Sequence, residues 1–231
     1  MRRTMRLPSI LLLLVLAATA APPDPVVSLA TGRLRGSPLG QGGAVFKGIP
    51  YAQPPAGDLR WRPPAPVKPW SGERSATAWG PPCAQNSNGR MLQNSSEDCL
   101  FLNVWTADWP SHISGKASRK PVMLWLHGGG NYAGTASGDN FDGESLARHG
   151  VLLVTVNYRL TVFGFFAHPE LTRESGRESG HHASGNYGLM DQIAALQWVH
   201  DNIERFGGDP ANVTLFGQSA GAVDANVLMT S

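Results

Sequence analysis

The segment Val213-Thr214-Leu215-Phe216-Gly217-Gln218-Ser219-Ala220-Gly221 places a serine between two glycines directly after a short apolar run. The apolar run, residues 213–216, is typical of a buried strand, and residues 222–229 can continue as a helix. The glycines suit a sharp turn, where backbone segments come close together and a side chain would collide. The segment therefore predicts a strand, a tight turn that presents the Ser219 hydroxyl, and a helix.

This order matches the G-x-S-x-G pattern of a nucleophile elbow, although a five-residue pattern also arises by chance in an ordinary Gly-Ser loop. A second glycine run, His127-Gly128-Gly129-Gly130, follows the apolar run at 122–126. Backbone N–H groups in such a run can approach a developing oxyanion without interference from side chains. A flexible turn is the alternative for this run, and we interpret His127 as a packing residue of the loop.

The rest of the pattern indicates an α/β protein. Residues 122–126 and 151–156 are continuous apolar runs, which suit strands covered on both faces. Between residues 189 and 206 apolar residues recur at helical spacing, and Gly207-Gly208 follows as a stop signal. The order strand, loop, strand, helix, strand predicts a mostly parallel central sheet. Upstream, residues 100–105 predict another strand, and residues 21–67, rich in glycine and proline, predict short strands in an ordered arm.

Composition excludes several classes of function. With 231 residues, 42% of them hydrophobic, the chain can bury a substantial core. Nineteen basic and seventeen acidic residues leave a formal charge of +2, so nothing indicates a nucleic-acid partner. We find no metal-ligand spacing and no phosphate-binding loop, and we expect no cofactor.

Residues 1–20 have the pattern of a signal peptide: a basic start, an apolar run at 10–18, and the small residues Ala18-Thr19-Ala20. An uncleaved anchor is the alternative, but a spanning helix needs ~20 apolar residues. We therefore expect a secreted or periplasmic protein without stable membrane insertion after cleavage. An oxidising compartment would allow the only two cysteines, Cys83 and Cys99, to form a disulfide, and two unpaired buried thiols are the alternative.

From about Thr31 onward the chain resembles the type-B carboxylesterase and cholinesterase family. The resemblance rests on motifs in a fixed order, which include the following: Phe46-Lys47-Gly48-Ile49-Pro50-Tyr51-Ala52, Glu97-Asp98-Cys99-Leu100-Phe101-Leu102-Asn103-Val104-Trp105, Asn157-Tyr158-Arg159, Asn186-Tyr187-Gly188-Leu189-Met190-Asp191-Gln192, Ala195-Leu196-Gln197-Trp198-Val199, and Phe206-Gly207-Gly208-Asp209-Pro210. Together with the two glycine motifs they are distributed over nearly the whole chain from about Thr31 to the end.

The resemblance implies an α/β-hydrolase fold and a serine carboxylesterase that acts on small-molecule esters. It implies that Ser219 is the nucleophile and that the backbone N–H groups of Gly129, Gly130 and Ala220 form the oxyanion hole. It also implies that Cys83 pairs with Cys99. Two further pairs implied by the family are structural ion pairs, Arg60 with Glu97 and Arg159 with Asp191.

In α/β-hydrolases the catalytic acid and histidine follow the serine. Residues 220–231 contain no histidine, and their only acid, Asp224, is interpreted as a helix-surface or packing residue. We therefore expect residues 21–231 to be the N-terminal part of the domain, incomplete at the C-terminus and inactive alone. A non-catalytic binding or adhesion module is the alternative class, although the intact Ser219 motif favours an enzyme. Amides, lactones or carbamates as substrates, and the oligomeric state, stay open.

Overall fold

The computed structural model describes residues 24–87, 89–109, 119–138 and 142–231. The predicted signal peptide, residues 1–20, lies outside the described residues. Within the described parts of the chain, no helix is both long enough and apolar enough to cross a membrane.

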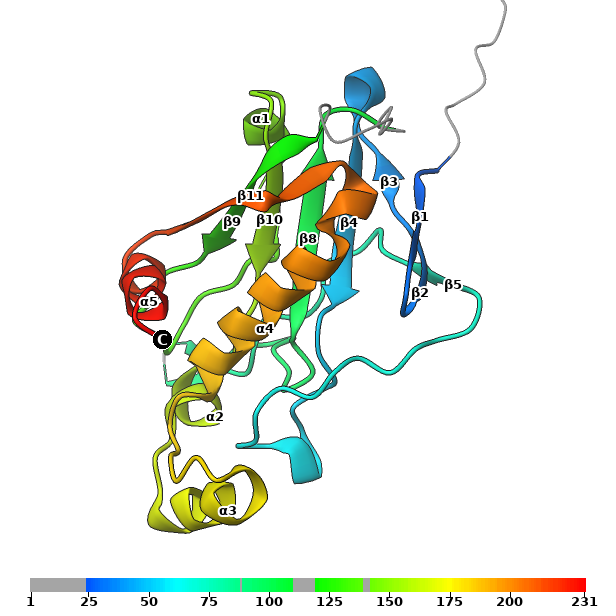
Figure 1. Cartoon of the computed structure of the whole chain (residues 1–231). Helices are drawn as coiled ribbons and strands as arrows, with labels where there is room; N and C mark the ends of the chain where they lie inside the picture. The colour runs from blue at the N-terminus through cyan, green and yellow to red at the C-terminus, as the bar shows by residue number, and fades with distance from the viewer. Residues whose placement is uncertain (1–23, 88, 110–118, 139–141) are drawn as a thin grey trace, which may run out of the picture.

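A six-stranded sheet forms the centre of the molecule, with the order β11-β9-β10-β8-β4-β3 (Figure 1). Apolar runs of the predicted kind build its middle, and every residue of β8 and of β10 is buried. The strand bounds are Ser37–Pro38 for β3, Ala44–Pro50 for β4, Phe101–Thr106 for β8, Lys120–Leu126 for β9, Leu152–Val156 for β10 and Gly208–Gly217 for β11.

The sheet is mixed, which corrects the expectation of a mostly parallel sheet for the described residues. β9 pairs in parallel with both β11 and β10, whereas the pairs β10–β8, β8–β4 and β4–β3 are antiparallel. For β3 and β4 the physical reason is connectivity, because parallel neighbours need a crossover connection of a dozen or more residues and these two strands are joined by a short segment. The α/β fold class is confirmed.

The long predicted helix is α4, Tyr187–Asn202, and it lies across one face of the sheet (Figure 1). It begins two residues before the predicted start, and its last turn tightens into a 3-10 helix, Ile203–Phe206. Gly207 then adopts a left-handed φ of 93° and ends the helix, as the stop signal predicts. Trp198, Val199 and Phe206 bury this helix face against the sheet.

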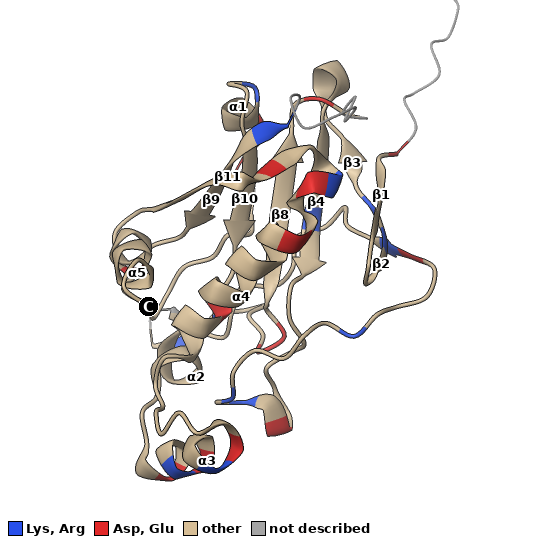
Figure 2. Cartoon of the chain, viewed as in Figure 1, with Lys and Arg blue, Asp and Glu red and all other residues tan. Residues whose placement is uncertain are grey.

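Four shorter α-helices complete the layer structure of the residues that the structure describes. They are α1 (Glu144–Ala147), α2 (Thr161–Phe165), α3 (Pro169–Ser179) and α5 (Ala220–Leu228). Apolar periodicity did not predict the first three, because α1 and α2 are single turns and α3 buries no residue. Figure 2 shows basic and acidic residues side by side on α3, as expected for a helix that faces solvent.

The N-terminal arm forms a second, three-stranded sheet, as the glycine- and proline-rich composition predicts. It comprises β1 (Val26–Leu29), β2 (Gly32–Arg35) and β5 (Glu73–Ser75). The loop beyond it carries a small hairpin of β6 (Asn86–Ser87) and β7 (Arg90–Met91). Two 3-10 turns, Gly40–Gly42 and Gly57–Leu59, lie in the arm.

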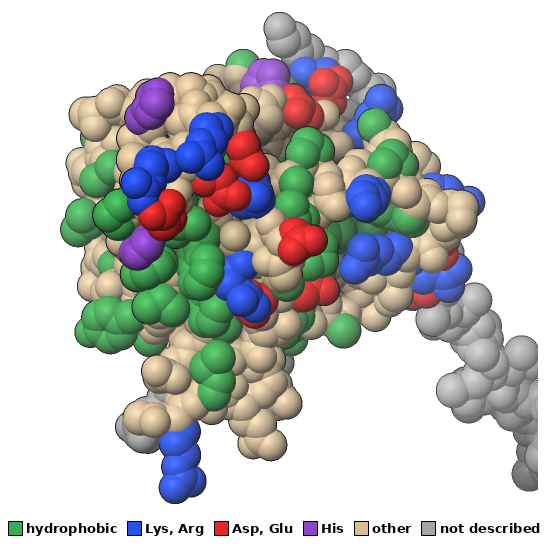
Figure 3. Space-filling view, turned by 90° about the horizontal axis from the view of Figure 1, so that it is seen from below, with side chains coloured by type: hydrophobic (Ala, Val, Ile, Leu, Met, Phe, Trp, Pro, Cys, Tyr) green, Lys and Arg blue, Asp and Glu red, His purple; other side chains and the backbone are tan. Residues whose placement is uncertain are grey.

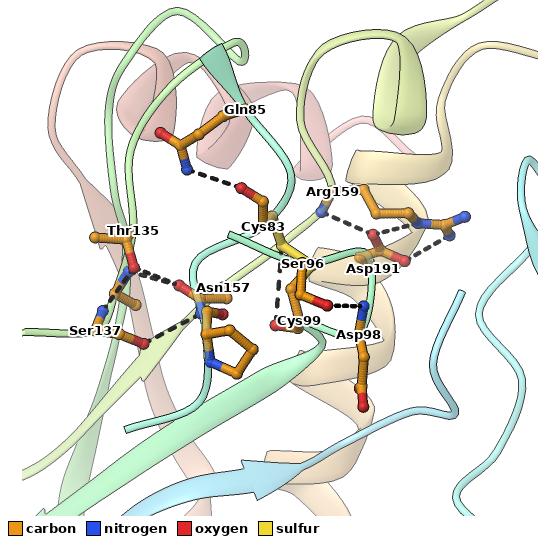
Figure 4. Close-up of a disulfide and its surroundings, with 12 residues drawn as sticks. Cys83, Gln85, Ser96, Asp98, Cys99, Thr135, Ser137, Asn157, Arg159 and Asp191 are labelled. Atoms are coloured by element: carbon orange, nitrogen blue, oxygen red, sulfur yellow. Dashed lines mark hydrogen bonds and ion pairs between the residues drawn. A yellow bond between two sulfur atoms is a disulfide. The ribbon is translucent and has the colours of Figure 1, made fainter. Parts of the chain in front are cut away.

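Covalent and ionic links attach the arm and α4 to the sheet (Figure 4). Cys83 and Cys99 form a disulfide, so the alternative of two free thiols is wrong. Glu97, close to this disulfide in sequence, accepts two hydrogen bonds from Arg60 at 2.5 and 2.6 Å. Both partners of this pair are partly exposed, and exposed pairs contribute little to stability.

The second ion pair is fully buried. Arg159, 2% exposed, donates to both carboxylate oxygens of Asp191, 0% exposed, at 2.8 and 2.7 Å. The backbone N–H of Arg159 also donates to Asp191. This pair fixes α4 to the segment that follows β10, and both predicted ion pairs are confirmed.

Candidate active site

Ser219 lies in the predicted sharp turn between β11 and α5. Its backbone has φ 54° and ψ −123°, a combination that costs on the order of 1–3 kcal/mol and persists only where surrounding structure enforces it. The residue is exposed to solvent, and helix α5 begins directly after it. Close backbone contacts around the turn hold this conformation, in which Ser219 lies exposed at the end of β11.

The elbow glycines are required by close backbone contacts. A Cβ atom at Gly221 would lie 2.7 Å from the carbonyl oxygen of His127 and would overlap the carbonyl of Leu126. A Cβ atom at Gly217 would lie 2.5 Å from the carbonyl carbon of Gly221. Real Cβ atoms essentially never come this close to backbone, so both positions demand glycine.

Strand register brings the second glycine motif to the same place. β9 and β11 are parallel neighbours, and Leu126 at the end of β9 pairs with Gly217 at the end of β11. The loop after β9 therefore starts beside the elbow. A Cβ atom at Gly128 would lie 3.1 Å from the Cβ atom of Ser219 and 2.6 Å from the carbonyl oxygen of Gln218, so the loop packs directly on the turn.

Three backbone N–H groups, in the glycine loop and at the start of α5, make no hydrogen bond within the part of the chain that the structure describes. Gly129 and Gly130 are exposed, with φ values of 111° and 64°. Neither of them, nor Ala220 at the start of α5, donates a hydrogen bond to any residue that the structure describes. Backbone N–H groups of this kind can stabilise a negatively charged oxygen.

His127 is a packing residue of the loop, as interpreted from the sequence. Its ring is 2% exposed and stacks on Tyr158 with 4.4 Å between ring centroids. Nδ1 lies 2.8 Å from the carbonyl oxygen of Gly128. Burial lowers the pKa of His127 to about 4, against the opposing effects of this hydrogen bond and of the negative charge on Asp224. The imidazole is therefore neutral at neutral pH.

Apolar side chains border the turn and the loop. Tyr132 in the glycine loop is 66% exposed, and Val223 on the first turn of α5 is 62% exposed. Figure 3 shows hydrophobic side chains gathered over much of the face that contains the lower ends of the strands and helices in Figure 1. No cluster of side chains suited to a metal ion occurs among the described residues.

Comparison with known proteins identifies the family. Residues 23–231 match the model of the carboxylesterase family. The chain belongs to this family. It is 48% identical to the fumonisin B1 esterase of Sphingopyxis macrogoltabida over 189 aligned residues. This alignment covers 80% of this chain and 33% of the esterase. It is 43% identical over 226 residues to carboxylesterase 1F of Mus musculus, covering 90% of this chain and 37% of the relative.

Solved esterase structures agree with this assignment and confirm the α/β-hydrolase fold. A PNB esterase superposes with a TM-score of 0.76 at 42% identity, covering 90% of this chain and 40% of the other. A carboxylesterase of Geobacillus stearothermophilus gives the same TM-score and identity, covering 89% and 40%. This carboxylesterase-family chain thus spans about a third to two-fifths of the length of the relatives it matches.

Sequence reasoning missed the polar network behind the glycine loop of this carboxylesterase-family chain. Asp224 is 3% exposed and accepts hydrogen bonds from Asn131 and Gln192. It is therefore a packing residue and not a residue of the helix surface. Asn131 and Gln192 come from a loop and a helix far from α5 in sequence. The one available signal was an acid on the apolar stretch that follows Ser219.

Proposed function

We propose that this chain carries the nucleophile and the oxyanion hole of a carboxylic ester hydrolase that works through a serine acyl-enzyme. The supporting observation is the exposed Ser219 in a strained turn, packed against a glycine loop with unengaged N–H groups. Family membership supports the same reaction, because the relatives include proteins named as esterases.

In the proposed reaction, Ser219 Oγ adds to the acyl carbon of the ester and the carbonyl oxygen becomes negative. The N–H groups of Gly129, Gly130 and Ala220 donate to this oxygen, and each such donor contributes roughly 3 kcal/mol to transition-state stabilisation. The C–O bond to the alcohol then breaks, and the alcohol leaves with the serine proton. Water adds to the acyl-enzyme and releases the carboxylic acid.

The proton carrier in this proposal is a histidine outside the 231 residues. Residues 220–231 contain none, and His127 is buried, stacked on Tyr158 and in contact with the Gly128 carbonyl. Because the relatives are much longer than this chain, we propose that a longer polypeptide supplies the histidine and its acid. The 231 residues alone should then show only the residual catalysis of the hole and of binding.

We propose small-molecule esters as substrates, with an apolar group placed beside Tyr132 and Val223. We also propose export from the cytoplasm. The disulfide between Cys83 and Cys99 supports export, because disulfides persist mainly in oxidising compartments. The apolar amino-terminal segment is consistent with the same route.

Hydrolysis of a short-chain p-nitrophenyl ester tests the proposal. Three proteins are compared: the 231-residue chain, a longer polypeptide that continues it to the length of the relatives, and the longer polypeptide with Ser219→Ala. We expect activity only in the longer, serine-intact protein. Equal activity in the Ser219→Ala variant would refute the nucleophile, and no activity in any of the three would favour a binding or adhesion module.

A further inference from the structure

Asp224 joins three elements behind the glycine loop. It lies five residues after Ser219, on α5, and its side chain is buried. Oδ1 accepts a hydrogen bond from Nδ2 of Asn131 at 3.0 Å, and Oδ2 accepts one from Nε2 of Gln192 at 2.7 Å. Asn131 belongs to the glycine loop and Gln192 to α4. The carboxylate of Asp224 therefore links α5, on which it lies, to both the loop and α4.

The loop needs such a restraint because two flexible glycines precede Asn131, which itself has an unfavourable backbone conformation. Gly129, Gly130 and Asn131 all have positive φ, at 111°, 64° and 62°. The two glycines adopt positive φ without strain, whereas Asn131 does so at a cost that its surroundings must offset, although asparagine tolerates this region better than most residues. The Asn131 side chain provides that hold through Asp224, and its backbone oxygen accepts from the N–H of Thr161 at 2.8 Å.

The carboxylate is not explained by an ion pair. No lysine, arginine or histidine within the described ranges forms a salt bridge with Asp224. Burying a charge without a cation is costly, so its hydrogen-bond donors matter more than usual. The amide of Gln192 presents its N–H to Asp224 and leaves its own Oε1 buried without a hydrogen-bond partner among the described residues. The amide keeps this orientation because rotating it by 180° would place Oε1 of Gln192 against Oδ2 of Asp224, and two acceptor oxygens repel each other.

We propose that Asp224 is a positioning residue that holds the glycine loop against the nucleophile elbow through Asn131. The inference rests on the proposed esterase function. Asp224 and Ala220 share helix α5, whereas Gly129 and Gly130 immediately precede Asn131. The hydrogen bond between Asp224 and Asn131 therefore sets the distance between the two sides of the oxyanion hole.

The test is made in the longer, active polypeptide with the variant Asp224→Asn. The amide keeps the size of the carboxylate but turns one acceptor into a donor, which then faces the N–H of Asn131 or of Gln192. We expect kcat to fall about tenfold to a hundredfold, a part of the loss seen when one oxyanion donor is removed, while KM changes less than about threefold. The affinity for a trifluoromethyl ketone, whose adduct carries an oxyanion, should fall by the same factor as kcat/KM.

The exchanged pair Asn131→Asp with Asp224→Asn provides a rescue. It restores one donor and one acceptor in reversed order and leaves a carboxylate oxygen for the hydroxyl of Tyr158, which now lies 3.4 Å from Asn131 Oδ1. We expect kcat within about threefold of the parent. Asp201→Asn, a matched change of an exposed acid on α4, should leave kcat unaltered.

Either of two results with Asp224→Asn and the exchanged pair would overturn the proposal. One is an unchanged kcat in Asp224→Asn, measured while Ser219→Ala is inactive, because the esterase function would then hold without the positioning role. The other is a loss of kcat that the exchanged pair does not recover although its melting temperature matches the parent. If Asp224→Asn fails to fold, Asn131→Ala removes the same hydrogen bond from the partly exposed side, and unchanged kcat there refutes the proposal equally. Activity in Ser219→Ala would instead refute the esterase proposal itself.

Discussion

Acidification should destabilise this protein through His127. Burial lowers the pKa of this imidazole in the folded chain to about 4, below the ordinary value of 6.5. Between these two values the unfolded chain binds a proton that the folded chain does not. The contribution of His127 to stability is therefore fully present above pH 6.5 and is lost progressively as the pH falls towards 4.

The size of the effect follows from the two pKa values. From 6.5 down to about 4, at about 1.4 kcal/mol per pH unit, the loss approaches 3 kcal/mol. The steepest slope of the free energy of unfolding against pH corresponds to one proton taken up on unfolding. A small domain is stable by only about 5–15 kcal/mol, so this single group removes a sizeable share of the total.

The assay is urea unfolding of the parent and of His127→Phe at several pH values between 4 and 7. Phenylalanine keeps an aromatic ring against Tyr158 but cannot bind a proton. The slope of the free energy of unfolding against pH should therefore be smaller than in the parent, by up to the slope that corresponds to one bound proton. Comparing slopes removes the constant cost of the lost hydrogen bond to Gly128. His149→Phe, at an exposed histidine, is the matched control for replacing a histidine by phenylalanine elsewhere in the chain. Identical slopes for the parent and His127→Phe would refute the burial argument.

Three further predictions concern the frame around the site. Arg159→Ala leaves Asp191 buried without its cation and should cost about 3–5 kcal/mol in the free energy of unfolding; a variant that melts like the parent would contradict this. Cys83→Ser opens the disulfide, whose cysteines are 16 residues apart, and should cost roughly 3 kcal/mol in chemical denaturation, with no loss counting against it. Gly221→Ala places a Cβ atom against the Leu126 carbonyl and should abolish esterase activity in the longer polypeptide, whereas full activity would show that the turn can relax.

Much of the fold was predictable because the decisive signals are local. The apolar runs that became β8, β9 and β10 and the helical periodicity of α4 are properties of short windows. The stop at Gly207 was also predictable, since a glycine with positive φ after an apolar helix is a common ending. Helix α3 was missed for the converse reason. It buries nothing, so no apolar pattern marks it, and only Pro169 at its start and Gly180 at its end were available as signals.

The candidate site divides in the same way. The motifs around Ser219 and Gly129 could be recognised because close backbone contacts demand glycine at fixed spacing. The network of Asp224, Asn131 and Gln192 could not, because its members come from α5, a loop and α4, and hydrogen bonds between distant segments leave no periodic trace. From the sequence alone, a single acid on an apolar helix can be either buried or at the surface. Only the fold shows that the amides of Asn131 and Gln192 donate hydrogen bonds to Asp224.

Strand register explains why these separate motifs meet. In the chain β9 is followed by β10, yet β11 pairs with the other edge of β9, so that Leu126 stands opposite Gly217. The carboxyl ends of three parallel strands thus deliver the glycine loop, Tyr158 and the Ser219 turn to one edge of the sheet, which is where open α/β sheets bind ligands. A slip of one residue between β9 and β11 would reverse the faces of the β11 side chains and would separate the loop from the turn. The close backbone contacts that require Gly128, Gly217 and Gly221 lie at this same end of the β9–β11 pair, so the residues that shape the turn also pack against the strand ends that bring the two motifs together.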